Sequence, residues 1–438
     1  MNIAQFIRYL NKTHGWNIEG RYYTDILAWR DWWRGDYMPF HTVKEMQLNG
    51  SIKSRDMYRL QMPKRICEDW ASLLLNDKTT VSVADKVSAD WLLGTDGSQT
   101  GGMLGQLNFW QHANELLELA FRSGTGAFVM SAEGLQLLSG AVMGSPGAKL
   151  YLDYLPAECI LPITIRHGQV VDVAFASEVV VGGKSCIYLQ THKLLDRGYR
   201  ITNEFFTSQN EDGEDAGYQP APLPKGMITG FETGSTVPWF SLLRPNIVKN
   251  RIGGPGLGVA VFAEALDAIK LCDLAFDNYA RDIRLGGKKV FYSRELLKSW
   301  VDEKGEQHYA APDEVRAELF ISPPGGDPDE TPDWHEYNPD LRVEANSKAV
   351  QDALDYASFR VGLGTHHYQF TGSAVKTATE YTGDRQDMVQ HANRHQINVE
   401  AALTGVLRAL LWAGKTLLAA PVDPDTELTI NFDDSYIT

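Results

Sequence analysis

At about residue 126 the spacing of the apolar residues along the chain changes, and helical segments give way to β-type runs. Between residues 126 and 240, short apolar runs are bounded by Gly, Pro, Asn and Asp, as in AFVMSA, LYLDYL, CILPITI, VVDVAFASEVVV, CIYLQTH and ITNEFFT. On both sides of this segment, apolar residues recur every three or four positions, which is typical of amphipathic helices. A β-rich segment between helical segments predicts an α+β fold.

The helices can be placed from their apolar faces and their end signals. MPKRICEDWASLLLND has Pro63 in its first turn, and NFWQHANELLELAFRSG ends at Gly124. Further helices are predicted over residues 259 to 285, 346 to 362 and 377 to about 419. Near the end of the chain, TELTINFDD predicts a closing strand.

Residues 1 to 35 are rich in aromatic side chains. Such residues can form a binding platform, but at helical spacing they belong more often to a core or a subunit contact. We therefore expect structural packing for Trp16, Tyr22, Tyr23, Trp29, Trp32 and Trp33.

The charge balance of the chain is acidic. It holds 56 acidic and 41 basic residues, a formal net charge of -15, with no long block of one sign. Tight binding to the DNA backbone depends on basic side chains that neutralise phosphates. A monomer with this surface is therefore not expected to bind DNA tightly.

Cysteine spacing and hydropathy limit the environments in which the chain can work. The absence of a CxxC pair argues against a disulfide framework and a cysteine zinc site, and favours a reducing cytoplasm. The start, MNIAQFIRYLNKTHG, lacks the features of a signal peptide. The stretch VLRALLWAGKTLLAA is interrupted by charges and too short to span a bilayer, so no membrane contact is expected. The cysteines are Cys67, Cys159, Cys186 and Cys272, and the interrupting charges are Arg408 and Lys415.

Two glycine-rich motifs imitate nucleotide-binding loops. GGKS requires a glycine five positions before Gly183, but position 178 is Glu178, so Gly182 and Gly183 predict a hairpin turn instead. GGPGLG, residues 253 to 258, follows no apolar strand and predicts a turn that introduces a helix. No GxSxG motif or complete nucleotide-binding loop occurs, which reduces the support for an enzymatic function.

A histidine pair on the last long helix is the strongest candidate for metal chemistry. His391 and His395 lie four residues apart, and Glu380 and Asp384 lie on preceding turns. The HExxH motif requires a glutamate after the first histidine, but position 392 is Ala392. A contact with a neighbouring subunit is therefore favoured, and a metal-dependent hydrolase built on these four residues stays open as an alternative.

The helix predicted over residues 259 to 285 has one apolar and one acidic face. Asp277 and Arg281, four residues apart, are expected to form an ion pair on the exposed side. The acidic face carries Glu264, Asp267, Asp273 and Asp277.

The order of these elements, together with several local strings, resembles the portal proteins of tailed bacteriophages. The order is helices, a β-rich unit, a long helix, a small Pro/Gly-rich module, a helix, a loop and a long helix with a polar start. The strings are PKRICEDWASLLLND, GTGAFVM, PAECILPITIRHGQVVDVAFAS, GVAVFAEALDAIKLCDLAFDNYARDIRLGGKKVF, KTATE and TINFDDS, and together they cover nearly the whole chain.

The resemblance implies a portal fold with a β-rich wing, a two-helix stem, a small α/β clip, a long spine helix and a truncated or minimal crown. Two features depart from the pattern: Gly383 predicts a kink or a late start of the spine helix, and the chain ends at FDDSYIT, where further crown helices are expected. The implied parts are the wing (1–250), stem helices (251–287 and 343–362), clip (288–342), tunnel loop (363–376), spine (377–420) and the start of the crown or closing strand (421–438).

The resemblance also implies a function without catalysis or a cofactor. Portal proteins form a ring, commonly a dodecamer, at one capsid vertex, and double-stranded DNA passes through it during packaging and ejection. The implied partners are the terminase large subunit, a head-completion or adaptor protein, and the major capsid or scaffolding protein. The implied locations are the virion and, during assembly, the host cytoplasm. Another phage minor head or adaptor protein is the alternative from the same class.

The implied tunnel loop lies in GLGTHHYQFTGSAVKTATE, where glycines at 362, 364 and 372 permit backbone motion. Its side chains are expected to make transient, non-specific contacts with DNA, and an acidic channel is expected to let DNA slide. The predicted loop contacts are His366, His367, Tyr368, Gln369, Phe370 and Lys376, and the candidates for lining the channel are Asp267, Asp273 and Asp277.

Overall fold

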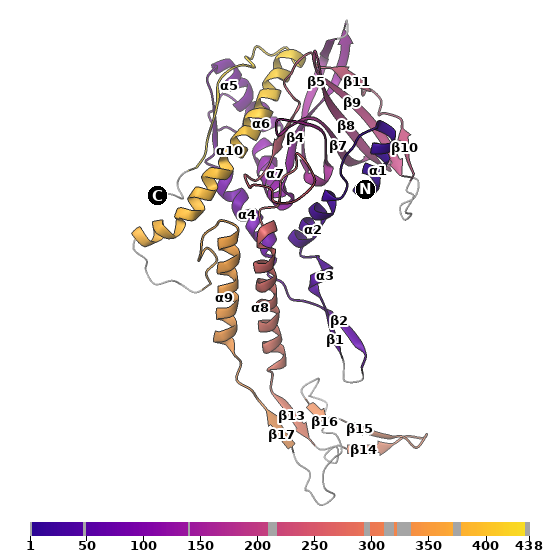
Figure 1. Ribbon diagram of the computed structural model, residues 1–438, viewed down its shortest axis with the longest axis vertical. Helices are drawn as coiled ribbons and strands as arrows, with labels where there is room; N and C mark the ends of the chain where they lie inside the picture. The colour runs from indigo at the N-terminus through magenta and orange to yellow at the C-terminus, as the bar shows by residue number, and fades with distance from the viewer. Residues whose placement is uncertain are drawn as a thin grey trace, which may run out of the picture. The chain divides into compact units, whose positions relative to one another are not determined.

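The chain forms two compact units in a computed structural model, which describes residues 2–46, 50–138, 141–208, 217–292, 298–310, 319–321, 334–370 and 378–433 (Figure 1). The first unit combines Met1–Pro39, Gln61–Ile269 and Asp355–Thr438, and the second combines Phe40–Leu60 and Lys270–Leu354. Both helices and strands build the fold, so the predicted α+β class is confirmed.

Antiparallel strands form the centre of the first unit. One sheet has the order β10-β9-β8-β7-β6, with β11 also paired to β9, and another has the order β12-β4-β5. The turn between β7 and β8 is formed by Gly182 and Gly183, with φ values of 57° and 78°, which confirms the predicted hairpin. The strands are β4 Gly126–Leu138, β5 Ala141–Pro156, β6 Ile160–Arg166, β7 Gln169–Val181, β8 Lys184–Leu195, β9 Gly198–Ser208, β10 Tyr218–Ala221, β11 Gly230–Glu232 and β12 Phe240–Leu243.

Helices pack around these strands. Pro63 lies in the first turn of α4, and Gly124 ends α7 in the left-handed conformation, as predicted. A Cβ at Gly124 would lie 2.6 Å from the backbone of Gly258, so the close approach of the two segments requires glycine there. The helices are α1 Ile3–His14, α2 Tyr22–Arg34, α3 Met38–His41, α4 Met62–Leu74, α5 Lys86–Leu93, α6 Gly102–Gln106, α7 Phe109–Ser123, α10 Ala378–Leu417 and the short 3-10 turns η1 Ala157–Cys159 and η2 Ala263–Ala265.

The predicted closing strand is confirmed as β18, Leu428–Asn431. It pairs antiparallel with β3, Thr80–Val83, so that two segments about 350 residues apart meet in one sheet. α10 is one helix from Ala378, which means that Gly383 does not delay its start. Its second half supplies the predicted apolar face, because Val399, Leu403, Val406, Leu410 and Leu417 are all buried.

The aromatic residues of the first 35 positions belong to the core, as predicted. Among them, Tyr22, Tyr23, Trp29 and Trp32 are at most 3% exposed. The Tyr23 hydroxyl donates a hydrogen bond to the Ile160 carbonyl, which ties the N-terminal helices to the sheet. Trp33 is half-buried.

In the second unit, a helix pair brackets a small β module (Figure 1). α8, Leu266–Leu285, precedes the module and α9, Val343–Arg360, follows it. β13 pairs with β16 in parallel and with β17 antiparallel, while β14 pairs with β15. The strands are β13 Lys289–Tyr292, β14 Lys298–Val301, β15 Gln307–Ala310, β16 Leu319–Ile321 and β17 Trp334–Tyr337.

Two helix starts differ from the sequence expectation. α8 begins at Leu266 and not at Val259, because the chain after the predicted glycine turn first makes a buried irregular stretch and η2. α9 begins at Val343, three residues before the predicted start at residue 346. Asn346 instead lies inside the helix and donates a hydrogen bond to Asp282.

The second unit also contains a hairpin that was not predicted from the sequence. β1, Thr42–Met46, pairs antiparallel with β2, Ile52–Asp56. The predicted wing, residues 1 to 250, would include this hairpin, but the structure groups Phe40–Leu60 with α8 and the β module. The portal boundaries stay predictions. Among the described residues, no helix is both long and apolar enough to cross a membrane.

Candidate functional site: the acidic helix and the glycine-flanked loop

Asp273 and Asp277 of α8 point at the segment that contains the β1–β2 hairpin. They lie one helical turn apart and are 1% and 4% exposed. Asp273 Oδ2 lies 3.0 Å from Nε2 of His41, and its Oδ1 accepts a hydrogen bond of 2.9 Å from the Leu60 N–H. Asp273 therefore binds the chain on both sides of the hairpin, at His41 before β1 and at Leu60 after β2.

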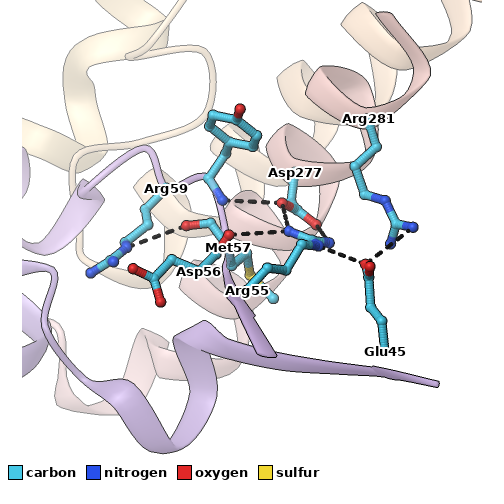
Figure 2. Close-up of polar contacts among 8 residues, drawn as sticks. Glu45, Arg55, Asp56, Met57, Arg59, Asp277 and Arg281 are labelled. Atoms are coloured by element: carbon cyan, nitrogen blue, oxygen red, sulfur yellow. Dashed lines mark hydrogen bonds and ion pairs between the residues drawn. The ribbon is translucent and has the colours of Figure 1, made fainter. Parts of the chain in front are cut away.

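Asp277 forms the second anchor, with Arg55 of β2 (Figure 2). The Arg55 guanidinium donates to both carboxylate oxygens, at 2.8 and 2.7 Å, and the Tyr58 N–H donates to Oδ1 at 3.0 Å. Burial alone would raise the pKa of Asp277, but the hydrogen bonds from Arg55 and Tyr58 outweigh it and lower the pKa below its usual value. Asp277 is therefore held as a carboxylate.

Glu45 of β1 extends this network. Its Oε1 accepts a hydrogen bond of 2.7 Å from Arg55 Nε and lies 3.3 Å from Nη2 of Arg281 on α8. Both strands of the hairpin are thus tied to α8 by charged groups, as Figure 2 shows. We call Glu45, Arg55, Asp273, Asp277 and His41 the hairpin anchor.

The acidic face of α8 differs from the sequence expectation. The expected exposed pair of Asp277 with Arg281 is wrong, because Asp277 is buried against Arg55 and Arg281 pairs with Glu45. Asp273 and Asp277 are both engaged by the hairpin segment, while Asp267 is exposed. That these aspartates line a channel stays a prediction. The hydrogen-bond partners of Asp273 and Asp277 give both a structural role within one subunit.

The face that α8 exposes is instead partly apolar. Leu271, Leu274 and Leu285 are 44%, 42% and 47% exposed. Their spacing of three and eleven residues places them on one side of the helix. Ile283 is 52% exposed and lies on another side of the helix.

In the first unit, the loop that follows α9 begins inside the core. Val361, Gly362, Leu363 and Gly364 are buried, and the Val361 carbonyl accepts a hydrogen bond of 3.3 Å from the Trp70 indole. Gly362 and Gly364 have φ values of 82° and 80°, which favour glycine. The glycines thus produce a tight helix end in this structure.

The next loop residues are docked on acidic side chains of the same unit. Nδ1 of His366 lies 3.0 Å from the Asp355 carboxylate. The Tyr368 hydroxyl donates a hydrogen bond of 2.8 Å to Asp69 of α4, and Nε2 of His367 lies 3.6 Å from the same carboxylate. Burial, followed by the nearby Asp69 carboxylate, raises the pKa of the Tyr368 hydroxyl.

The remaining predicted loop contacts are in a different environment. Gln369 is exposed and Phe370 is 75% exposed. Lys376 lies outside the described residues. Gln369 and Phe370 are therefore available for contact with another molecule, as is His366, whose side chain is 48% exposed although it pairs with Asp355.

Of the two histidines of α10, His395 packs in the core and His391 lies against the start of the loop. His395 is 3% exposed, packs against the rings of Trp70 and Phe121, and accepts a hydrogen bond of 3.0 Å at Nδ1 from the Asn246 N–H. Burial, with smaller contributions from neighbouring charges, lowers the pKa of His395 to about 3. The His391 ring lies against Gly362, where a Cβ would approach to 2.7 Å.

These contacts bear on the metal hypothesis. The side chains of Glu380 and Asp384 lie outside the described residues. Within the described part of the chain, no group of three or more His, Cys, Asp or Glu side chains is arranged to hold a metal ion. The described cysteines are free thiols, and Cys67, Cys186 and Cys272 are buried.

Comparisons with known proteins add little to this geometry. No protein-family model and no curated protein sequence matches the chain. Among solved structures, a chain described as the neck of an empty GTA particle, computed with C6 symmetry, is similar to this protein. The two share 11% sequence identity with a TM-score of 0.37, over 85% of this chain and 81% of that chain. At this TM-score a common fold is not established, so the functional argument depends on the residues of this chain.

Proposed function

We propose that the chain is a portal-type structural protein of a tailed bacteriophage or prophage. In this proposal, copies of the chain form a closed ring at one capsid vertex, and double-stranded DNA passes through its channel during packaging and ejection. The protein then acts by assembly and not by catalysis, and it needs no cofactor.

The observation that carries the proposal is the helix pair around a small β module, with an apolar stripe left exposed. Near the end of α8, Asp282 binds Arg342 and Asn346 at the start of α9, at 2.8 Å each, so the two helices run in opposite directions. The exposed stripe of Leu271, Leu274 and Leu285 is suited to burial against another subunit. Contacts between two different faces of neighbouring copies form a ring when the rotation from one copy to the next closes.

The hairpin anchor supports the same proposal. A hairpin of two strands is marginally stable on its own in water. Here β2 is fixed to α8 by buried, charge-assisted hydrogen bonds. A ring that repeats one contact many times requires such a rigid surface in every copy.

The loop after α9 fits a transient contact with DNA. Asp355 and Asp69 hold His366 and Tyr368, while His366, Gln369 and Phe370 are exposed. A short, mostly uncharged contact would touch DNA without releasing many counterions, so DNA could continue to move. The terminase large subunit, an adaptor protein and the capsid or scaffolding protein are the partners that this proposal implies.

The alternatives account for fewer of these observations. A minor head or adaptor protein does not require the helix–module–helix plan followed by an anchored loop. A metal-dependent hydrolase requires His395 as a ligand, but this histidine is packed in the core and its Nδ1 accepts a backbone hydrogen bond.

Native mass spectrometry of a stripe variant tests the proposal. The wild-type chain is expected at one high multiple of the subunit mass, and Leu271→Asp with Leu274→Asp is expected to shift it to monomers or small oligomers with an unchanged circular dichroism spectrum. The control is Val87→Asp, which changes a 47% exposed residue of α5 and should leave the oligomer intact. A wild-type monomer, or a full-size oligomer of the double variant, would contradict the proposal.

A further inference from the structure

A pocket of about 340 Å³ lies in the first unit, between the β4 end of one sheet and the facing strands β8 and β9. This volume is at the lower end of the range for sites that hold a small ligand or a large side chain. Its lining includes Ala132 and Leu135 of β4, Tyr188 and Gln190 of β8, Asn203 of β9 and Trp239 before β12.

One polar side chain in the pocket is left without a hydrogen bond. The Tyr188 hydroxyl donates to Asn203 Oδ1 at 2.7 Å, and Asn203 Nδ2 donates to the Ile228 carbonyl at 2.8 Å, so the Asn203 amide is satisfied. The indole N–H of Trp239, a residue of the pocket lining, is buried without a partner in the described part of the chain. Gln190, which is 4% exposed, presents a carboxamide in the same lining. Buried polar groups are normally paired, so the Trp239 N–H points to a missing ligand.

Beside the pocket, the edge of β4 is unpaired. β12 pairs with Gly126 to Val129 of β4, and the last bond on this side runs from the Met130 N–H to the Trp239 carbonyl, at 2.7 Å. From Ser131 onward, the described chain supplies no backbone partner on the side of β4 away from β5. Ala132, two residues after Met130, directs its N–H and C=O to that same side and also lines the pocket.

The chemistry of the pocket selects an uncharged occupant. Its rim carries one acidic and one basic residue, Glu133 and Lys225, and its walls include the apolar side chains of Leu135, Met227 and Phe231. A charged group would lose its hydration on entering, and the two opposite rim charges offer it no net compensation. A carboxamide such as that of Gln190 can donate to a peptide carbonyl and accept from a peptide N–H.

We propose that the free edge of β4 and the adjoining pocket bind an extended segment of another protein. The segment adds to β4 as a further strand, inserts one apolar side chain into the pocket and places a peptide group on the Gln190 amide. Addition of a strand to an exposed sheet edge is an established mode of peptide recognition, in which the edge gives affinity and the pocket gives specificity. This docking site does not depend on ring formation.

Binding of short synthetic peptides tests the site. The probes are capped seven-residue peptides of alternating threonine and valine, with phenylalanine, alanine or aspartate at the centre, measured by isothermal titration calorimetry. The phenylalanine peptide is expected to bind at least tenfold more tightly than the other two. Two variants, Gln190→Leu and the pocket-filling Ala132→Trp, are each expected to weaken binding of the phenylalanine peptide at least tenfold. The matched control is Gln219→Leu, on the exposed face of β10.

Each other outcome overturns the proposal. Three results would show that the edge and the pocket do not act together. They are failure of all three peptides to bind at millimolar concentration, equal binding of all three peptides, and unchanged peptide binding by a folded Gln190→Leu variant. Binding of AMP without peptide binding would make the pocket a small-molecule site. Self-association lost in Gln190→Leu, without peptide binding, would assign it to a second copy of this chain.

Discussion

Removing the Arg55 side chain tests whether buried charge fixes the hairpin to α8. Arg55→Met keeps much of the side-chain length but leaves the Asp277 carboxylate, whose side chain is 5% exposed, with the Tyr58 N–H as its main remaining hydrogen-bond donor. Breaking a buried ion pair from one side costs about 3–5 kcal/mol. The positive charge of Arg281 also stabilises the Asp277 carboxylate and compensates in part, so we expect a loss of stability near the lower end of this range, about 3 kcal/mol.

Hydrogen exchange measures this loss locally. The hairpin can detach without unfolding the first unit, so the cost should appear as faster exchange in the peptides that cover β1 and β2. At about 1.4 kcal/mol for each tenfold change, 3 kcal/mol corresponds to roughly 150-fold faster exchange. Peptides from the core of α7 should keep wild-type rates.

Arg30→Met is the matched control for Arg55→Met. Arg30 also pairs with an aspartate, Asp31, but their side chains are 27% and 38% exposed, and such pairs contribute about 0–1 kcal/mol. Equal effects of the two variants, or unchanged exchange of the hairpin in Arg55→Met, would refute the account of the hairpin anchor. A double-mutant cycle with Asp277→Asn should show coupling on the order of 1–3 kcal/mol.

Three further changes have defined outcomes. Burial lowers the pKa of His192 to about 3, so the unfolded state binds a proton below about pH 6.5 that the folded state does not. His192 should therefore contribute a loss of stability of about 1.4 kcal/mol per pH unit between pH 6 and 4, and His192→Leu should reduce the slope measured in urea titrations by about this amount. Tyr368→Phe removes the hydrogen bond to Asp69 and should cost about 1 kcal/mol, with faster proteolysis of the loop; an unchanged rate would show that the loop is not held there. Phe370→Ser should leave assembly intact but lower the yield of packaged DNA; loss of the oligomer would instead make Phe370 a structural residue.

Local patterns were sufficient to predict much of the fold. The helix that begins near Pro63, the helix that ends at Gly124 and the β-rich segment follow from apolar spacing and from terminal signals a few residues away. The hairpin of β1 and β2 also has a local signal, the Asn49-Gly50 dipeptide between two short runs of alternating character, which the sequence analysis did not use.

The candidate site was less predictable because its contacts join distant segments. Asp277 has the sequence features of an exposed helix residue, and its burial is made favourable by Arg55, 222 residues earlier, together with the Tyr58 N–H. Similarly, Tyr368 is held by Asp69, 299 residues away, so the glycines of the loop suggested mobility where the structure has an anchored segment. Spacing within one element carries no information about such partners.

Negative-stain electron microscopy of the purified wild-type chain, with native mass spectrometry on the same sample, tests the central claim most directly. The portal proposal predicts closed rings of uniform diameter with a central hole, and one dominant mass that is an integer multiple of the subunit mass. Discrete monomers at tens of micromolar, or open filaments without closure, would contradict it.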